Sequence, residues 1–190
     1  MRLLASPIIL ASASPRRREL LWQIGVPHRV AVAGIDERPL AGEAPAECVQ
    51  RLALAKARHC ADPRLPVLGA DTEVVLGDTV YGKPADAADA ARMLRELSGR
   101  SHEVITAVWV LSAGREAHAL QRSEVRFAAL DEQDIADYLA SGEWQGKAGA
   151  YAIQGRAGAF IAQLTGSHSS VMGLPLHETH NLLRGFGLRA

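Results

Sequence analysis

The stretch from residue 9 to residue 21 constrains the fold more than any other, because an apolar strand pattern runs directly into a helix pattern. Ser14 is a good helix N-cap, and Pro15 suits the first helical position, where its missing N–H costs nothing. Apolar residues at helical spacing follow, and Gly25 can end the helix in a left-handed conformation. We therefore expect a strand–turn–helix unit with its helix over residues 14–24.

Three consecutive arginines, Arg16 to Arg18, fall in the first turn of this expected helix. The free N–H groups and the macrodipole already make a helix N-terminus positive, so each basic side chain there costs on the order of 0.3–1 kcal/mol. A bound phosphate would reverse the sign of that effect. Two interpretations stay open from the run alone: an anion-binding helix start, or arginines that fan outward into solvent.

Strand and helix signals alternate through the first half of the chain, and a long hairpin is expected in the middle. Further helices are expected over residues 45–60, 86–98, from Asp131 through Leu139, and from Pro175 to Gly185, and strands over 7–13, 28–33, 66–70, 104–111, 124–127 and 159–164. The mixture predicts an α/β protein with a mixed β-sheet flanked by helices. With 190 residues, we expect a single domain over 1–190. The sequence leaves open whether this domain is divided into two lobes.

Composition excludes several classes of partner. Lys+Arg and Asp+Glu both number 21, so no net field favours nucleic acid or an acidic membrane surface, and no apolar run is long enough to span a membrane. The first residues imitate a secretory signal, but Ser6-Pro7 interrupts the apolar run and cleavage would separate a strand from its helix. Cys48 and Cys60 fall in one expected helix, which argues against a disulfide between them. We expect a cytoplasmic protein.

A few polar residues stand where chemistry is possible. Asp71 follows an expected strand, and the carboxyl ends of strands in open α/β sheets face the ligand crevice. Lys56 continues an inward-facing apolar stripe on its helix, so it either reaches a polar partner or runs along its stem to the surface. The pair Asp36-Glu37 in a polar loop could hold a hard divalent cation, although a solvated acidic pair is the commoner outcome. None of the seven histidines is expected to be catalytic.

Two further segments indicate a function only weakly when each is considered alone. Lys83 lies in a tight turn after an expected hairpin with Gly77-Asp78 as its loop, and alone it would be an ordinary surface lysine. The segment 146–155 has too many glycines for regular structure, so its backbone could approach a ligand closely. The Gln154 amide in that segment could read the edge of a base.

Six motifs in this order resemble those of the Maf-like nucleoside triphosphate pyrophosphatases over nearly the whole chain. They are Ser12-Ala13-Ser14-Pro15-Arg16-Arg17, Ile35-Asp36-Glu37, Gly69-Ala70-Asp71-Thr72, Gly82-Lys83-Pro84, the run from Lys147 to Gly155, and Gly166-Ser167 through Val171-Met172-Gly173-Leu174-Pro175. The resemblance implies a two-lobed fold around a central cleft, similar to that of inosine triphosphatases. It also implies hydrolysis of a nucleoside triphosphate to the monophosphate and pyrophosphate in a house-cleaning role, with Mg²⁺ or Mn²⁺ as cofactor.

The same resemblance assigns roles to residues. It maps the general base onto Asp71, a metal ligand onto Glu37, and substrate-binding residues onto Ser12, Arg16, Arg17, Lys56, Thr72, Lys83 and Gln154. Among these, Arg16, Thr72 and Gln154 match specificity positions. The form Tyr151-Ala152-Ile153-Gln154-Gly155 is similar to that of the branch acting on dTTP and UTP, whereas the 7-methyl-GTP branch has Glu near the Gln position.

The residues supply a matching mechanism. We expect Asp71 to take a proton from the attacking water while Glu37 helps to hold the cation. The arginines and lysines would balance the roughly four negative charges of a triphosphate at neutral pH. Gln154 offers both a donor and an acceptor to the edge of a uracil or thymine ring, and a Glu there could only accept.

Other functions stay open at this point. One is a pyrophosphatase of different base preference, such as 7-methyl-GTP. Another is a nucleotide-binding regulator of cell division that does not hydrolyse its ligand, although Asp71 and Glu37 beside a polyanion argue against it. A nucleic-acid-binding module is the weakest, because aromatic residues do not alternate with the basic ones. The family is commonly dimeric, and the sequence indicates no interface, so homodimer formation stays open.

Overall fold

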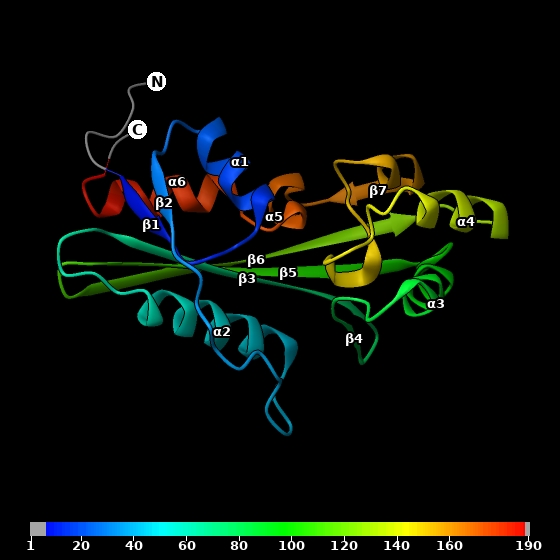
Figure 1. Ribbon diagram of the computed structural model, residues 1–190, viewed down its shortest axis with the longest axis horizontal. Coiled ribbons are helices and arrows are strands. Elements are labelled where there is room, and N and C mark those ends of the chain that lie inside the picture. Colours follow the sequence, from blue (N-terminus) through cyan, green and yellow to red (C-terminus); the bar gives the residue numbers. More distant parts are fainter. Residues whose placement is uncertain (1–6, 189–190) are drawn as a thin grey trace. The chain divides into compact units, whose positions relative to one another are not determined.

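The computed structural model describes residues 7–188 and contains a mixed sheet flanked by helices, as predicted (Figure 1). The strands are β1 (Ile8–Leu10), β2 (His28–Val30), β3 (Val67–Leu76), β4 (Thr79–Tyr81), β5 (Ser101–Ser112), β6 (Arg115–Phe127) and β7 (Ile161–Thr165). Their order is β2-β1-β3-β5-β6-β7, with β4 paired to β3. Strand β1 is parallel to β2 and β3, whereas the pairs β3–β4 and β6–β7 are antiparallel.

The helices match the expected segments closely. They are α1 (Pro15–Gln23), α2 (Pro45–His59), α3 (Ala87–Leu97), α4 (Glu132–Ala140), α5 (His168–Met172) and α6 (Leu176–Gly185), together with the 3-10 helices η1 (Ala148–Ala150) and η2 (Arg156–Phe160). The described chain divides into two compact units. The first comprises the described residues up to Asp71, Thr106–Gln121 and those from Gly173 on, and the second comprises Thr72–Ile105 and Arg122–Met172. The expectation of one domain over 1–190 stays a prediction.

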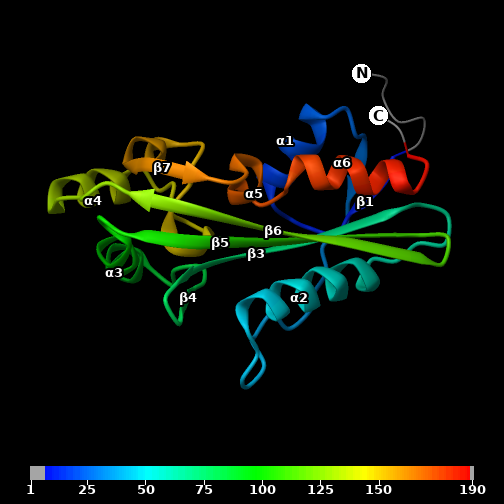
Figure 2. The same ribbon diagram turned by 180° about the vertical axis from the view of Figure 1, so that it is seen from behind.

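In the first unit, α2 covers one face of the strands while α1 and α6 cover the other (Figures 1 and 2). Helix α1 ends as expected at Gly25, which has φ +70°. The N–H of Val26 then donates to the carbonyl of Leu21 at 2.9 Å, a bond that satisfies one of the last carbonyls of the helix. On α2, the stripe formed by Val49, Leu52 and Lys56 is buried, as its spacing predicted.

In the second unit, a core of aromatic and aliphatic side chains joins α3 and α4 to the strands. Phe127, Tyr138 and Leu94 are among its fully buried members. Asp86 and Asp131 cap α3 and α4 by accepting from backbone N–H groups three residues on, at 2.8 Å in both cases. The predicted hairpin loop at Gly77-Asp78 is confirmed, since Leu76 pairs with Thr79.

Some boundaries were wrong. The strand expected over 66–70 continues to Leu76, so Asp71 lies inside β3 instead of after it. The hairpin strands β5 and β6 also run further than the apolar pattern suggested, because pairing with neighbouring strands sustains them through polar residues. The short α5 was not expected.

Within residues 7–188, no helix is long and apolar enough to cross a membrane. Both cysteines are free thiols, as expected for two residues of one helical segment. Residues 1–6, which enter the comparison with a secretory signal, lie outside the described part of the chain.

Candidate active site

The start of α1 turns one of its three arginines inward. Arg17 is only 9% exposed, whereas Arg16 is half-buried and Arg18 is exposed. The Nε of Arg17 donates to the carbonyl of Gly173 at 2.7 Å, and its Nη1 donates to the Oγ of Ser12 at 3.0 Å. Of the two interpretations left open by the sequence, the outward fan therefore does not hold for Arg17 and does hold for Arg18.

Ser12 organises this turn. Its Oγ accepts the N–H of Ser14 at 3.2 Å as well as the Arg17 guanidinium. The hydroxyl therefore connects the end of β1 to the first turn of α1 and fixes the direction of the arginine. Because the backbone of this turn and the guanidinium share one anchor, a substitution at Ser12 would disturb both.

Lys56 joins two carboxylates. Its Nζ donates to Oδ1 of Asp71 at 2.6 Å and lies 2.9 Å from Oε1 of Glu37. The side chains of Lys56 and Asp71 are 9% and 11% exposed, whereas that of Glu37 is 43% exposed. Lys56 therefore reaches a polar partner and does not run outward along its stem, which settles the alternative that its helical position left open.

The close approach of α2 to β3 makes this contact possible. Gly69 lies under α2, where a Cβ would meet the carbonyl oxygen of Ala53 and would come within 2.8 Å of the backbone nitrogen of Ala57. Two residues further along β3 comes Asp71, and about one turn further along α2 comes Lys56. The strand and the helix therefore have to touch at Gly69 for the carboxylate and the ammonium to meet.

The charges of the cluster balance one another. Burial lowers the pKa of Arg17, and the negative charges of Asp71 and Glu37 oppose that shift. Arg17 and Lys56 thus contribute two positive charges against two carboxylates. Buried charges are tolerated only when they are paired in this way. A cluster that is neutral by itself offers an anionic ligand no net positive charge, and the half-buried Arg16 lies directly before Arg17 in the sequence.

The two carboxylates fit a divalent cation that a ligand helps to hold. Within residues 7–188, no three His, Cys, Asp or Glu side chains gather into a metal-binding cage. Glu37 and Asp71 nevertheless present oxygens to one common atom, Lys56 Nζ. Mg²⁺ is commonly held by one or two carboxylates together with phosphate oxygens and water, and Mn²⁺ also favours oxygen ligands. The donor set therefore suits either ion.

The remaining predicted site residues belong to the second unit. Thr72 is half-buried on β3, Lys83 is exposed between β4 and α3, and Gln154 is exposed in the turn after η1. The carbonyl of Gly82 accepts the N–H of Gly149 at 3.1 Å, so the turn that carries Lys83 is tied to the segment that leads to Gln154. The structure thus gathers Ser12, Arg17, Glu37, Lys56 and Asp71 in the first unit.

Two features of these surroundings were missed from the sequence. Gly173, whose carbonyl accepts from Arg17, lies 156 residues further along the chain, and only the motif around it hinted at a role. His102 is 3% exposed, and its Nε2 lies 2.9 Å from the hydroxyl of Tyr151, close to Gln154 in sequence. A lone histidine in a strand carries no sequence signal for such a contact.

An α/β fold with paired carboxylates and cations beside a helix start is typical of enzymes that act on phosphorylated substrates. The family model described as Maf-like protein matches residues 7–186. The chain therefore belongs to the Maf-like protein family.

Several curated relatives cover almost the whole chain. A protein of Xanthomonas axonopodis pv. citri (strain 306) is 54% identical over 187 residues, covering 95% of this chain and 98% of the relative. One of Ralstonia nicotianae is 54% identical, covering 93% and 92%, and one of Symbiobacterium thermophilum is 51% identical, covering 95% and 94%. All three are named dTTP/UTP pyrophosphatase. Among solved structures, the Staphylococcus aureus Ham1 protein matches with a TM-score of 0.48 and 13% identity, covering 95% of this chain and 97% of that one.

Proposed function

We propose that this protein is a nucleoside triphosphate pyrophosphatase that hydrolyses dTTP and UTP to the monophosphate and pyrophosphate. The observation that carries the chemistry is the buried Asp71 carboxylate, bonded to Lys56 in one cluster with Arg17 and Glu37. The substrate pair rests on the relatives, which are named for it at up to 54% identity over 95% of the chain. Their names and the cluster support the same type of reaction.

In the proposed reaction, a water oxygen attacks the α-phosphorus of the triphosphate. The bond between that phosphorus and the oxygen bridging to the β-phosphorus breaks, and pyrophosphate leaves with its electron pair. Asp71 is the general base that takes the proton of the attacking water, a role typically worth 10²–10⁴-fold in rate. The hydrogen bond from Lys56 Nζ holds this carboxylate in one orientation, so the base is in place before the substrate binds.

The cations stabilise the phosphate charge as it moves onto the leaving group. Arg17 presents a planar guanidinium held by Ser12 and Gly173, so little ordering is needed when a phosphate binds. Lys56 would exchange part of its contact with the carboxylates for a phosphate oxygen. Arg16 and Lys83 are proposed to supply the further positive charge that the neutral cluster lacks.

We propose Glu37 as the protein ligand of Mg²⁺ or Mn²⁺, which leaves Asp71 free to act as the base. When bound, the cation would neutralise charge on the triphosphate and lower the barrier to attack. Glu37 suits this position because it is the more exposed of the two carboxylates and can therefore turn toward a ligand.

Base selection is assigned to Gln154, with Thr72 and Arg16 as further specificity residues. A uracil or thymine ring alternates carbonyl and N3–H groups along its edge, and the Gln154 amide can donate to one and accept from the other. We also propose a cytoplasmic location, which free thiols support, and no nucleic-acid partner, which the balanced charge supports. A homodimer stays open.

The experiment that tests this function is pyrophosphate release from dTTP, UTP, CTP and 7-methyl-GTP, each with and without Mg²⁺. We expect release from dTTP and UTP, dependent on the cation. Preferential turnover of 7-methyl-GTP would instead support a different base preference. Binding of UTP without any release of pyrophosphate would support the non-hydrolysing regulator.

A further inference from the structure

The loop that carries Glu37 needs an anchor. It connects β2 to α2, and it includes Gly34, Pro39 and Gly42, which do not belong to a helix or strand. Glu37 nevertheless has to reach Lys56, on the same helix that the loop enters. An unanchored loop of this length would sample many conformations, and holding the Glu37 carboxylate in one of them would cost conformational entropy.

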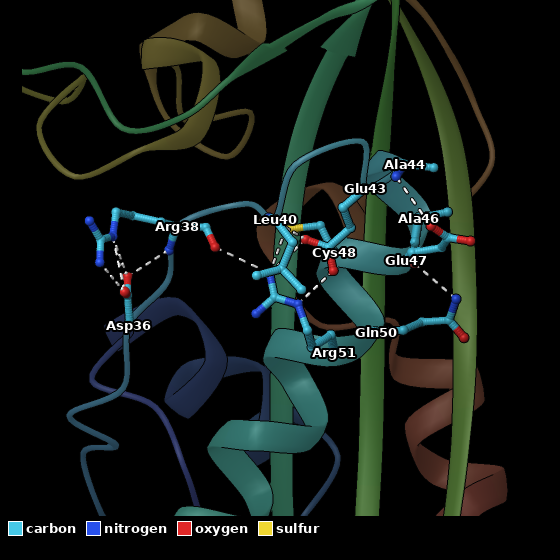
Figure 3. A network of polar contacts seen from close by, with 10 residues as sticks. All are labelled: Asp36, Arg38, Leu40, Glu43, Ala44, Ala46, Glu47, Cys48, Gln50 and Arg51. Atoms are coloured by element: carbon cyan, nitrogen blue, oxygen red, sulfur yellow. Dashed lines mark hydrogen bonds and ion pairs between the residues drawn. The ribbon is translucent and has the colours of Figure 1, made fainter.

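Arg51 supplies that anchor from the second turn of α2 (Figure 3). Its Nε and Nη2 donate to the two carboxylate oxygens of Glu43 at 2.5 and 2.6 Å. The same Nη2 also donates to the carbonyl of Arg38 at 3.2 Å. One guanidinium therefore holds the loop at two places, and one of them is the residue directly after Glu37.

Glu43 extends the anchor into the loop. Its Oε2 accepts the N–H of Leu40 at 2.9 Å while its side chain, 8% exposed, is paired with Arg51. Hydrogen bonds from the Arg51 guanidinium lower the pKa of Glu43 to about 2, with a further contribution from the Leu40 N–H. The carboxylate is therefore charged throughout the neutral range and keeps its bonds there.

A second ion pair in the loop is much weaker. Asp36 accepts from the N–H and the guanidinium of Arg38 and so shapes the turn around Glu37. The two side chains are 59% and 87% exposed, and solvent screens the attraction between charges that are this exposed. The Arg51–Glu43 pair, partly buried and bidentate, is therefore the stronger constraint on the loop.

We propose that Arg51 and Glu43 are positioning residues that hold the Glu37 loop against α2 and so present the Glu37 carboxylate to Lys56. Arg51 and Lys56 lie five residues apart on one helix, so the helix that carries the ammonium also fixes the loop that brings the second carboxylate to it. The role of the anchor in turnover rests on the proposed function, whereas the role in ordering the loop does not.

Hydrogen exchange on the protein without nucleotide or metal tests the ordering. We compare wild type with Arg51→Met, Arg51→Lys and Glu43→Gln, and use Arg58→Met as the matched control. Arg58 lies on the same helix and forms an exposed bidentate pair with Glu116 at 3.0 and 3.2 Å, away from the loop. We expect amide exchange over residues 36–43 to accelerate about tenfold or more in Arg51→Met and Glu43→Gln, and not in the control.

Arg51→Lys separates charge from geometry, because lysine cannot form the planar two-bond contact. We expect it to restore only part of the protection. Unchanged exchange over 36–43 in Arg51→Met and Glu43→Gln would overturn the proposal, as would an equal acceleration in the Arg58 control. If Arg51→Met does not fold, Glu43→Gln gives the same reading from the other side of the pair.

A double-mutant cycle tests the action through Glu37. Arg51→Met should lower kcat for UTP about tenfold in the wild-type background and have no further effect in Glu37→Gln. Equal losses in both backgrounds would refute a role through Glu37. If the wild type releases no pyrophosphate from any nucleotide, the proposed function fails, and hydrogen exchange still decides whether the anchor orders the loop.

Discussion

Replacing Gly69 by alanine tests the close contact on which the cluster depends. The added Cβ would collide with the carbonyl oxygen of Ala53 and would lie 2.8 Å from the nitrogen and 2.9 Å from the Cβ of Ala57. Ordinary contacts of this kind begin at 3.4 Å. All three atoms belong to the backbone or to the Cβ of a buried alanine, so no flexible side chain can move aside. Helix α2 must therefore retreat from β3 by about 1 Å.

Overpacking in a core typically costs about 1–3 kcal/mol, and three rigid contacts place Gly69→Ala near the upper limit. Where space allows, replacing glycine by alanine stabilises a protein by about 0.4–1 kcal/mol, so the sign of the effect is itself informative. A loss of about 3 kcal/mol corresponds to a fall in Tm of roughly 6–12 °C for a chain of this size. Turnover should fall as well, because the retreat stretches the bond between Lys56 and Asp71.

Urea unfolding measures the change, with Gly34→Ala as the control. A Cβ at Gly34 meets no atom within 4 Å, so the control should stay within about 0.5 kcal/mol of wild type. Stability of Gly69→Ala equal to or above that of wild type would refute the argument that this contact sets the distance between α2 and β3.

Three further variants probe the charges and the amide. Burial lowers the pKa of His102 from 6.5 to about 4. As the pH falls, this histidine is therefore protonated in the unfolded chain before it is protonated in the folded protein. Stability should fall by up to ~3 kcal/mol as pH drops from 6.5 toward 4, and His102→Gln should flatten that slope in urea unfolding; an unchanged slope would exclude His102 as its source. Lys56→Met leaves the Asp71 carboxylate buried without its ammonium partner and should lower the free energy of unfolding by about 3–5 kcal/mol. Adding Asp71→Asn to the same chain should recover part of that loss. If the effects of the two single substitutions simply add, the pairing is contradicted. Gln154→Glu should lower kcat/KM for UTP and dTTP about 10²-fold without changing Tm, whereas unchanged kinetics would remove Gln154 from base selection.

Local signals were enough for much of the fold. The glycine stop at Gly25 and the Asp131 cap were predicted because each acts within a few residues of its own position. The spacing placed Lys56 on an inward-facing stripe of its helix but left open whether it reaches a polar partner. The features predicted correctly, the Gly25 stop and the Asp131 cap, are those whose determining contacts lie within one element.

Contacts between distant segments set the rest. The length of β3 beyond Asp71 depends on pairing with other strands, which local propensity does not report. The inward turn of Arg17 depends on the carbonyl of Gly173. The Arg51–Glu43 anchor was not anticipated, because an arginine and a glutamate eight residues apart carry no signal unless the loop between them folds back.

The most direct test of the account is the turnover of UTP by Asp71→Asn, measured beside its affinity for UTP. Asparagine keeps an oxygen for Lys56 but is a far weaker base than a carboxylate. We expect pyrophosphate release to fall by about 10²–10⁴-fold, with the Kd for UTP within about threefold of wild type. Release at the wild-type rate would contradict the assignment of Asp71 as the general base.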